Sequence, residues 1–475
     1  MNLCWFRQDL RLSDNPALRS ALSDNSAIAL FILEETDTQR PMGSACKAWL
    51  HESLIRLQSD LEAIGVPLVL RRGDARDIIP KLTSDLKIDN VYWNRRYDPK
   101  DVAIDRALME HLKEEGVNVE SFKANVLFEP WEIKSAGAGT PYKVFSPFWK
   151  AALKEGVPAQ SLAVPTKIQS KPQLDQLPFD NLEDWDLMPA SPNWTNGFWD
   201  VWVPGEAGAF ERFKEFLEIN LKGYSQNRDV PSKNHTSCLS PHLRFGEISP
   251  LQIWHGVHAH SGGEVDKDGY KFLAEVGWRE FSHSILFYAD NLSQTNWKSD
   301  FDGFAWVQDE NGLTAWQSGQ TGYPLVDAGM RELWQTGYIH NRVRMVVASF
   351  LIKHLRIDWR EGEAWFWDTL VDACPANNPA SWQWVAGSGA DASPFFRIFN
   401  PIMQSEKFDP KGSYIRKWVP ELANLDNKSI HTPWEAPKLV LQEVGVRLGE
   451  NYPKPIVDHK TARDKALAAY KDMTA

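Results

Sequence analysis

Cysteine is scarce in this chain, and its spacing excludes the sites that cysteine-rich proteins build. The 475 residues include only four cysteines, which are Cys4, Cys46, Cys238 and Cys374. No two of them form a CxxC pair, which argues against a structural zinc site and against a disulfide framework. We therefore predict no metal centre.

Long apolar runs and an excess of basic residues are also missing. The N-terminus, MNLCWFRQDLRL, is charged at Arg7 and contains no stretch typical of a signal peptide or membrane span. We expect a cytoplasmic protein without a membrane partner. The net charge of -11 argues against general coating of nucleic acid, although a local basic groove is compatible with an acidic body.

Tryptophan, by contrast, is abundant, with 22 residues. Indole rings fill cores, but they also stack on bases and carry electrons, and composition alone favours the core. The stretch ANNPASWQW (376–384) places two tryptophans one residue apart after a pair of asparagines. Asparagine is a poor core residue because its buried amide needs partners. This stretch is therefore a candidate site.

The chain divides into three parts by pattern. Residues 1–130 alternate apolar runs (NLCWF, AIALFIL, VPLVL, NVYWN, VNVESF) with helical stretches such as 47–65. This alternation predicts an α/β domain with a Rossmann-like parallel sheet, although no GxGxxG follows the first run. Residues 131–205 are rich in Pro, Gly and Asp and predict a long linker. Residues 206–475 show helical periodicity and predict an all-α domain.

Two segments of the helical part combine polar groups that suit a ligand. In 224–250, hydroxyl groups precede a helix that we predict to begin near Pro250. They suit a phosphate, and simple helix capping is the alternative. In 272–286, a carboxylate, an indole and a guanidinium share one helix face, which suits a planar ligand or an ordinary amphipathic edge. These side chains are Thr236, Ser237 and Ser240 in the first segment, and Glu275, Trp278 and Arg279 in the second.

Two further segments carry arginines. In 321–363, polar residues crowd between His340 and Met345, and a buried arginine there needs a carboxylate such as Asp372. An internal ion pair is the simpler interpretation, and it is compatible with a role in shaping a site. In 382–410, small residues allow close backbone approach to a large ligand, and Arg397 and Lys407 add positive charge.

These motifs resemble the DNA photolyase/cryptochrome family along nearly the whole chain. The matching stretches are WFRQDLRLSDNPAL, TSCLSPHLRFGEISP, WREF, TGYPLVDAGMRELWQTGYIHNRVRM and WQWVAGSGADASPFFRIFNP. The resemblance is greatest to bacterial cyclobutane pyrimidine dimer photolyases. It implies an N-terminal antenna domain, a helical FAD domain, and light-driven repair by electron transfer from excited reduced FAD to a dimer flipped out of DNA.

The resemblance also assigns roles to individual residues. Those implied to bind FAD are Tyr224, Thr236, Ser237, Leu239, Ser240, Asn341, Arg344, Asp372, Cys374 and Asn378, with Asn378 opposite the flavin N5. Those implied at the flipped dimer are Glu275, Trp278, Asn341, Met345 and Trp384. The implied DNA-facing rim is Arg228, Arg279, Arg342, Arg397 and Lys407. The implied electron relay is Trp382, Trp359 and Trp306.

Two positions depart from the family pattern. Cys374, followed by Pro375, stands where the family usually has Asp facing the polar edge of the flavin, and a thiol is a weak hydrogen-bonding group. Cys238 stands where Arg is frequent, beside the phosphates. We expect an effect on flavin binding or redox tuning, and neither change removes a residue implied to contact the dimer.

The sequence is compatible with several alternatives. A cryptochrome senses blue light without repair, but Asn378 and the short C-terminal end argue against one. A (6-4) photolyase is associated with a pair of active-site histidines, whereas His340 here is followed by Asn341. The negative net charge and the flavin motifs argue against a general nucleic-acid-binding protein. The sequence does not choose between a folate, a deazaflavin, another flavin and no second antenna chromophore. Because the family is usually monomeric, we expect a monomer that binds damaged DNA.

Overall fold

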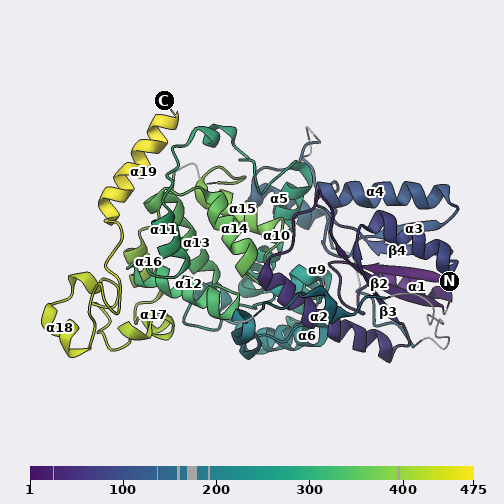
Figure 1. The fold of residues 1–475 in the computed structure, drawn as a ribbon, viewed down its shortest axis with the longest axis horizontal. Coiled ribbons are helices and arrows are strands. Elements are labelled where there is room, and N and C mark those ends of the chain that lie inside the picture. Colours follow the sequence, from purple (N-terminus) through teal and green to yellow (C-terminus); the bar gives the residue numbers. More distant parts are fainter. Residues whose placement is uncertain are drawn as a thin grey trace.

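The N-terminal part is a five-stranded parallel sheet, shown at the right of Figure 1. The computed structural model describes residues 1–24, 26–135, 137, 139–157, 161–167, 179–190, 193–392 and 396–474. The strands, in the spatial order β3-β2-β1-β4-β5, are β1 (Asn2–Phe6), β2 (Ala27–Glu34), β3 (Leu68–Gly73), β4 (Asn90–Asn94) and β5 (Asn118–Phe122). The five apolar runs of the sequence thus form the predicted sheet. Central β1 is buried along its whole length, as parallel strands covered on both faces are.

Four helices connect these strands, and a larger set forms the rest of the molecule. The connecting helices are α1 (Pro16–Ala21), α2 (Ser44–Ala63), α3 (Ala75–Leu86) and α4 (Pro99–Glu114). The helices that follow are α5 (Phe145–Glu155), α6 (Glu206–Glu215), α7 (Tyr224–Asn227), α8 (Ser240–Phe245), α9 (Pro250–His260), α10 (Lys267–Tyr288), α11 (Glu310–Gln317), α12 (Pro324–Thr336), α13 (Asn341–Ser349), α14 (Trp359–Thr369), α15 (Asn377–Ala386), α16 (Pro401–Phe408), α17 (Ser413–Trp418), α18 (Lys438–Glu443) and α19 (His459–Thr474). The predicted combination of an α/β part and a helical part is confirmed.

Helix boundaries follow local signals in the sequence. Helix α9 begins at Pro250 as predicted, after Ser249, which forms a reciprocal capping box with Gln252. The periodic stretch 329–355 is divided, because Gly337 adopts a left-handed conformation (φ 67°) that ends α12. After α13 the chain continues as a π-helical turn, η6 (Phe350–Leu355).

Two motifs far apart in sequence, at residues 7–16 and 244–250, join the α/β part to the helical part. The buried Arg11 guanidinium donates from Nη1 to the Gly246 carbonyl oxygen at 2.8 Å, and the Leu10 N–H donates to the Phe245 carbonyl oxygen at 3.0 Å. A Cβ on Gly246 would lie 1.9 Å from the Gln8 carbonyl oxygen, so only glycine permits this approach. The RQDLRLSDNP and RFGEISP motifs are therefore two sides of one interface.

The segment predicted as a linker, 131–205, contains a packed helix. Helix α5 contacts α10, and its Phe145, Phe148 and Ala152 are buried. Two short 3-10 turns, η2 (Leu182–Trp185) and η3 (Trp194–Asp200), follow before α6. The prediction was wrong for α5 because the surrounding Pro and Gly obscured an eleven-residue apolar helix. Other parts of 131–205 lie outside the described residues.

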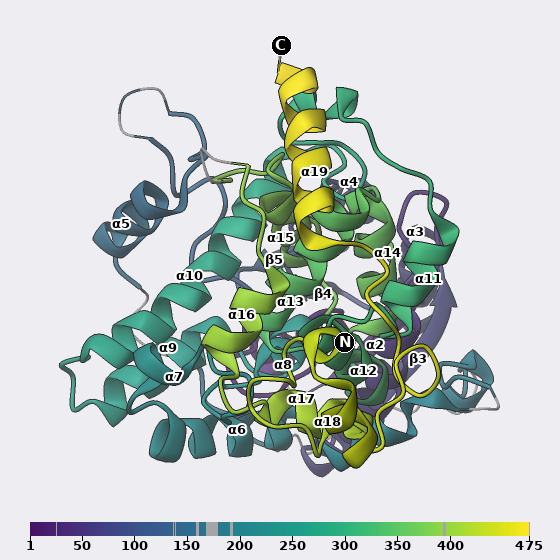
Figure 2. The ribbon, with the colours of Figure 1, turned by 90° about the vertical axis from the view of Figure 1, so that its left-hand side faces the viewer.

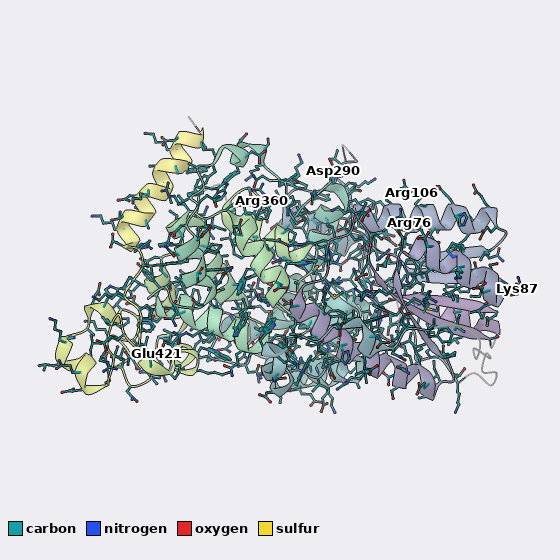
Figure 3. All side chains as sticks on the ribbon, viewed as in Figure 1. Arg76, Lys87, Arg106, Asp290, Arg360 and Glu421 are labelled. Carbon is teal, nitrogen blue, oxygen red and sulfur yellow. The ribbon has the colours of Figure 1, made fainter. Side chains whose placement is uncertain are left out.

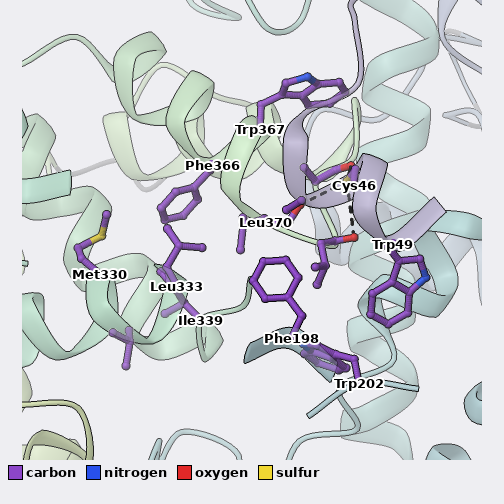
Figure 4. Close-up of a cluster of buried hydrophobic side chains, with 14 of the residues drawn as sticks. Cys46, Trp49, Phe198, Trp202, Met330, Leu333, Ile339, Phe366, Trp367 and Leu370 are labelled. Carbon is purple, nitrogen blue, oxygen red and sulfur yellow. Dashed lines mark hydrogen bonds between the residues drawn. The ribbon is translucent and has the colours of Figure 1, made fainter. Parts of the chain in front are cut away.

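Many of the tryptophans are buried in the hydrophobic core, as the composition predicts. Figure 4 shows one buried cluster, in which Trp49 and Cys46 of α2 lie beside Leu370 and Trp367. Charged side chains lie on the outside, for example Arg76, Lys87 and Arg106 on the α/β part in Figure 3. Among the residues that the structure describes, no helix combines the length and apolarity needed to span a membrane.

Candidate functional site

Asp372 is the point at which two of the predicted segments, 224–250 and 321–363, meet. Arg344 of α13 donates to both carboxylate oxygens of Asp372, with Nη1–Oδ1 at 3.0 Å and Nη2–Oδ2 at 2.9 Å. Ser240, the first residue of α8, donates from Oγ to Oδ2 at 2.6 Å. Two parallel bonds are the strong and oriented form of an arginine–carboxylate pair. Three residues far apart in sequence are thus held side by side.

Helix α13 begins with a buried histidine cap. His340 Nδ1 accepts the backbone N–H of Arg342 at 3.2 Å. Burial lowers the pKa of His340 to about 4, so the ring is neutral and its Nδ1 accepts at neutral pH. Arg342 Nη2 donates to Asp229 Oδ2 at 2.8 Å, and its guanidinium lies 4.5 Å from the ring centroid of Phe408 in α16. The cap and this ion pair fix the turn that carries Arg344.

We expect His340→Asn to reduce the loss of stability in acid, because asparagine caps helices without titrating. The unfolded histidine takes up a proton near pH 6.5, whereas folded His340 does so only near 4. Because the unfolded state binds more protons between these values, the wild type loses up to about 1.4 kcal/mol of unfolding free energy per pH unit on acidification. Urea unfolding at several pH values from about 4 to about 7 measures this slope. His111→Asn, at an exposed histidine, is the control, and an equal change of slope there would contradict the assignment.

Arg228 and Glu275 join the two segments that precede α13. The Arg228 guanidinium pairs with the Glu275 carboxylate of α10, and Lys271 Nζ lies 3.0 Å from the same oxygen, Oε1. Arg228 also lies 5.4 Å from the ring centroid of Tyr224, which is buried against Phe272. Glu275 is thus held from two sides while its side chain stays 28% exposed.

Trp278 and Arg279, which are neighbours on α10, face different surroundings. Phe145 of α5 stacks on Trp278, with ring centroids 3.9 Å apart and planes 11° from parallel. This covers one face of the half-buried indole. Arg279, predicted for a DNA-facing rim, instead donates from Nη1 to the Asn125 carbonyl oxygen at 2.7 Å, and its side chain is only 11% exposed. Arg279 joins α10 to the α/β part, because its helical position points it at that backbone.

Asn378 of α15 faces a glutamate that the sequence did not single out. Its amide Nδ2 donates to the Glu363 carbonyl oxygen at 3.0 Å and to Glu363 Oε1 at 2.9 Å. Helices α14 and α15 approach closely at Gly362, where a Cβ would lie 2.1 Å from Trp382 Cη2. Small size at Gly362 therefore places Trp382 against α14. Figures 1 and 2 show α10, α13, α14 and α15 grouped within the helical part, where α15 contacts the other three.

The WQW sequence has a separate role for each residue. Trp382 is 2% exposed and meets the rings of Phe366 and Trp316 edge-on. Gln383 is fully buried, and its Oε1 accepts the backbone N–H of Trp297 at 2.8 Å. Its Nε2 donates to the carbonyl oxygens of Leu292 and Thr295, in the loop that follows α10. Trp384 is half-buried and donates from Nε1 to a backbone carbonyl at 3.1 Å. The glutamine therefore anchors the helix, while the two indoles lie on either side of it in sequence.

The three predicted relay tryptophans run from the interior to the surface. Trp382 and Trp359 are buried, whereas Trp306 is partly exposed. Trp359 lies about one turn before Gly362 on α14, which is where Trp382 packs. The Val307 N–H donates to the Arg356 carbonyl oxygen at 2.7 Å, which places the chain beside Trp306 close to the start of α14.

The two cysteines of the predicted site differ in exposure. Cys374 is 6% exposed, and its Sγ accepts the backbone N–H groups of Ala376 and Asn377, both at 3.4 Å, at the start of α15. Cys238 is partly exposed and has a left-handed backbone (φ 50°), and its Sγ lies 3.4 Å from Thr236 Oγ1. Leu239 is buried, and its N–H donates to Ser237 Oγ at 3.4 Å. The thiol of Cys374 therefore takes the place of a helix-capping acceptor.

The remaining predicted residues lie at the surface of the same region. Asn341, Arg397 and Lys407 are exposed, and Met345 is half-buried. Lys407 lies in the last turn of α16, and its Nζ is 5.0 Å from the ring centroid of Phe408. The rim thus retains two freely exposed cations, while Arg228 and Arg342 are paired with carboxylates.

Sequence reasoning missed four residues that support these positions. They are Phe145 beside Trp278, Asp229 beside Arg342, Glu363 beside Asn378, and Trp316 beside Trp382. Glu363 is one of several acids in the sequence, and only the structure shows that it is buried. The other three become recognisable only from the folded contacts.

A separate cavity of about 500 Å³ lies at the carboxyl ends of β1 and β2. Its lining includes Arg7, Glu34, Arg40, Trp185 and Trp367. The cavity extends to Asp290, labelled in Figure 3 between the two parts of the molecule. Ligands of open α/β sheets bind in this kind of crevice.

Comparison with known proteins identifies the family. The model of the DNA photolyase domain matches residues 2–167, and that of the FAD binding domain of DNA photolyase matches residues 272–472. A deoxyribodipyrimidine photo-lyase of Agrobacterium fabrum is 51% identical over 468 residues, which cover 98% of this chain and 97% of that protein. Cryptochrome-1 of Arabidopsis thaliana is 38% identical, over 99% of this chain and 70% of that protein.

Solved structures agree with these matches. The crystal structure of a bacterial class III photolyase from Agrobacterium tumefaciens has a TM-score of 0.95 and 51% identity, and the alignment covers 100% of this chain and 97% of that one. An archaeal photolyase from Sulfolobus tokodaii, described with two FAD molecules, has a TM-score of 0.83 and 28% identity, covering 99% and 100%. The chain belongs to the DNA photolyase/cryptochrome family. The predicted family, enzyme class and FAD cofactor are confirmed.

Proposed function

We propose that this chain repairs cyclobutane pyrimidine dimers in DNA, driven by light and with reduced FAD as cofactor. The observation that carries the proposal is the convergence of Ser240 and Arg344 on Asp372, with Asn378 on the adjoining helix. The photolyase relatives support the reaction class. The kind of lesion and the electron route rest on the residues themselves.

The donors and acceptors of the site fit FAD. The Arg344–Asp372 pair offers a rigid polar edge to the flavin ring, and Asn378 offers an amide to N5. Hydroxyl and N–H groups of 236–240 suit the phosphates. The full cofactor set is Tyr224, Thr236, Ser237, Leu239, Ser240, Asn341, Arg344, Asp372, Cys374 and Asn378. When bound, reduced FAD excited by light supplies the single electron that no side chain can.

The chain's own residues receive and hold the lesion. Enzymes that act on a base in a duplex, photolyases among them, extrude it into a pocket. Trp278, braced by Phe145, and Trp384 each contribute about 1–3 kcal/mol by stacking on the extruded bases. Asn341 and Met345 complete the pocket. Glu275, held in place by Arg228 and Lys271, hydrogen-bonds the dimer, and in its protonated form it donates to the negative charge that develops there.

The rim and the tryptophans complete the proposed mechanism. Arg397 and Lys407, with the partly exposed Arg342 and Arg228, contact DNA phosphates, so binding weakens as salt rises. Trp382, Trp359 and Trp306 conduct electrons from the surface toward the cofactor. We further infer a cytoplasmic monomer, with the cavity at β1 and β2 as the place for a second, antenna chromophore.

A light-dependent repair assay tests the proposal. Purified protein with chemically reduced FAD is mixed with an oligonucleotide that carries one thymine cyclobutane dimer, and repair under blue light is compared with repair in the dark. We expect light-dependent restoration. Repair of a (6-4) photoproduct, without repair of the cyclobutane dimer, would favour a (6-4) photolyase. Absence of repair from protein that retains reduced FAD would favour a cryptochrome, and Cys374→Asp then tests whether the thiol is responsible.

A further inference from the structure

The segment just before α2 is attached to α14 by several contacts. Trp367 Nε1 donates to the Pro41 carbonyl oxygen at 2.8 Å, and both the N–H and Oγ of Ser44 donate to Asp368 Oδ1 at 2.8 Å. A Cβ on Gly43 would lie 2.0 Å from the Trp367 carbonyl oxygen. Figure 4 shows the same junction two residues later, where Cys46 Sγ donates to the Leu370 carbonyl oxygen at 3.3 Å. The α/β part is therefore fixed against the C-terminal end of α14.

Arg40 extends from this segment to Glu363. Arg40 Nη1 donates to Glu363 Oε1 at 2.8 Å, and its guanidinium lies 4.2 Å from the ring centroid of Trp367. The Glu363 side chain is only 1% exposed, whereas that of Arg40 is 28% exposed. A buried carboxylate needs a paired cation, and in the described structure Arg40 is the cation that pairs with this one.

Glu363 in turn sets the orientation of the Asn378 amide. Both atoms that face the amide, the Glu363 carbonyl oxygen and Oε1, are acceptors. Only the Nδ2 end can therefore face Glu363, since the Oδ1 end has no proton to donate. The carbonyl end of the amide is left for the cofactor. Reduced flavin carries a proton on N5 and needs an acceptor there, whereas oxidised flavin has a bare N5 and needs a donor.

We propose that Arg40 is a positioning residue, which acts through Glu363 to turn the Asn378 carbonyl oxygen toward the flavin and thereby favours reduced FAD. The inference rests on the proposed function, in which Asn378 lies at N5. It makes a residue of the antenna domain part of the redox control of the flavin. Arg40 touches neither the flavin nor the lesion, although it also lines the cavity at β1 and β2.

The electrostatics of Glu363 agree with this geometry. Burial raises the pKa of Glu363, and the Arg40 pair and the Asn378 hydrogen bond oppose that rise. Without Arg40, the protonated, neutral form of Glu363 becomes more populated. A neutral carboxyl group can donate a hydrogen bond to Asn378 Oδ1. One of the two interactions that orient the amide then favours the reverse orientation, in which Nδ2 faces the flavin and suits its oxidised form, and only the Glu363 carbonyl oxygen opposes it.

The test is a redox titration of the bound flavin in the holoenzyme. Arg40→Met keeps an apolar stem over Trp367 but removes the charge, and we expect it to reduce the preference for reduced FAD about tenfold, a fall in midpoint potential of about 30 mV for two electrons. Arg40→Lys is expected to shift it less. Ser44→Ala loosens the same junction without touching Glu363, so it should leave the potential unchanged.

Asn378→Ala separates this inference from the function on which it rests. If Asn378→Ala leaves the potential unchanged, the proposed role of Asn378 is wrong. If it shifts the potential while Arg40→Met does not, the inference about Arg40 is wrong and the role of Asn378 stands. In the double variant, Arg40→Met should add nothing to Asn378→Ala, and a full additional shift would overturn the route through Asn378. Thermal unfolding of each variant verifies that it is folded.

Discussion

Replacing Asp372 by alanine is expected to leave a protein that no longer retains FAD. The substitution leaves the Arg344 guanidinium without its carboxylate and removes the acceptor of Ser240. Removing one partner of a buried ion pair costs about 3–5 kcal/mol. If this cost appears as weaker binding of FAD, the affinity falls by more than about a hundredfold. The ratio of flavin to protein absorbance after purification measures this loss.

Loss of folding must be separated from loss of the cofactor site. A double variant, Asp372→Leu with Arg344→Met, replaces both charges by apolar groups, an exchange that is often neutral for stability. We expect its thermal unfolding to resemble that of the wild type freed of FAD, while FAD binding stays absent. Glu450→Ala, which breaks an exposed ion pair with Arg447, is the control and should change neither property. Normal FAD content in Asp372→Ala would show that the pair serves only the fold.

Local patterns predicted the fold because they depend on neighbours in sequence. The five apolar runs became strands, and the capping residue Ser249 started its helix where expected. The exceptions had local causes too. Gly337 divided a continuous helical period, and the Pro- and Gly-rich context hid the apolar face of the helix at Phe145.

The site could be predicted only in part, because its geometry joins residues distant in sequence. The Arg344–Asp372 pair was accessible from the sequence, since a buried guanidinium requires an acid. The partner of Asn378 was not, because Glu363 is one of many acids until α14 and α15 are packed. Arg279 is the opposite case, since the resemblance implied a DNA-facing side chain, whereas its guanidinium donates to the Asn125 backbone and is only 11% exposed.

Trp382→Phe is expected to abolish most photoreduction of oxidised FAD while repair by chemically reduced protein continues. Phenylalanine is far harder to oxidise than tryptophan, and each 1.4 kcal/mol added to a barrier slows a step about tenfold, so we expect a loss of at least about tenfold. The fold should tolerate the change, because a smaller ring fits the space that Gly362 leaves for the indole. Flavin absorbance under blue light with an external reductant follows the reduction, and the dimer oligonucleotide follows repair.

Trp316→Phe provides a matched control for this prediction. Its ring lies 6.1 Å from that of Trp382 and is equally buried, but it has no place in the proposed relay. It should therefore leave photoreduction close to that of the wild type. A loss as large as that in Trp382→Phe would move the electron route to Trp316, and equal loss of photoreduction and repair in Trp382→Phe would exclude a relay role. Slow photoreduction with intact repair, seen in Trp382→Phe alone, would assign the flavin end of the relay to Trp382, the tryptophan packed against Gly362.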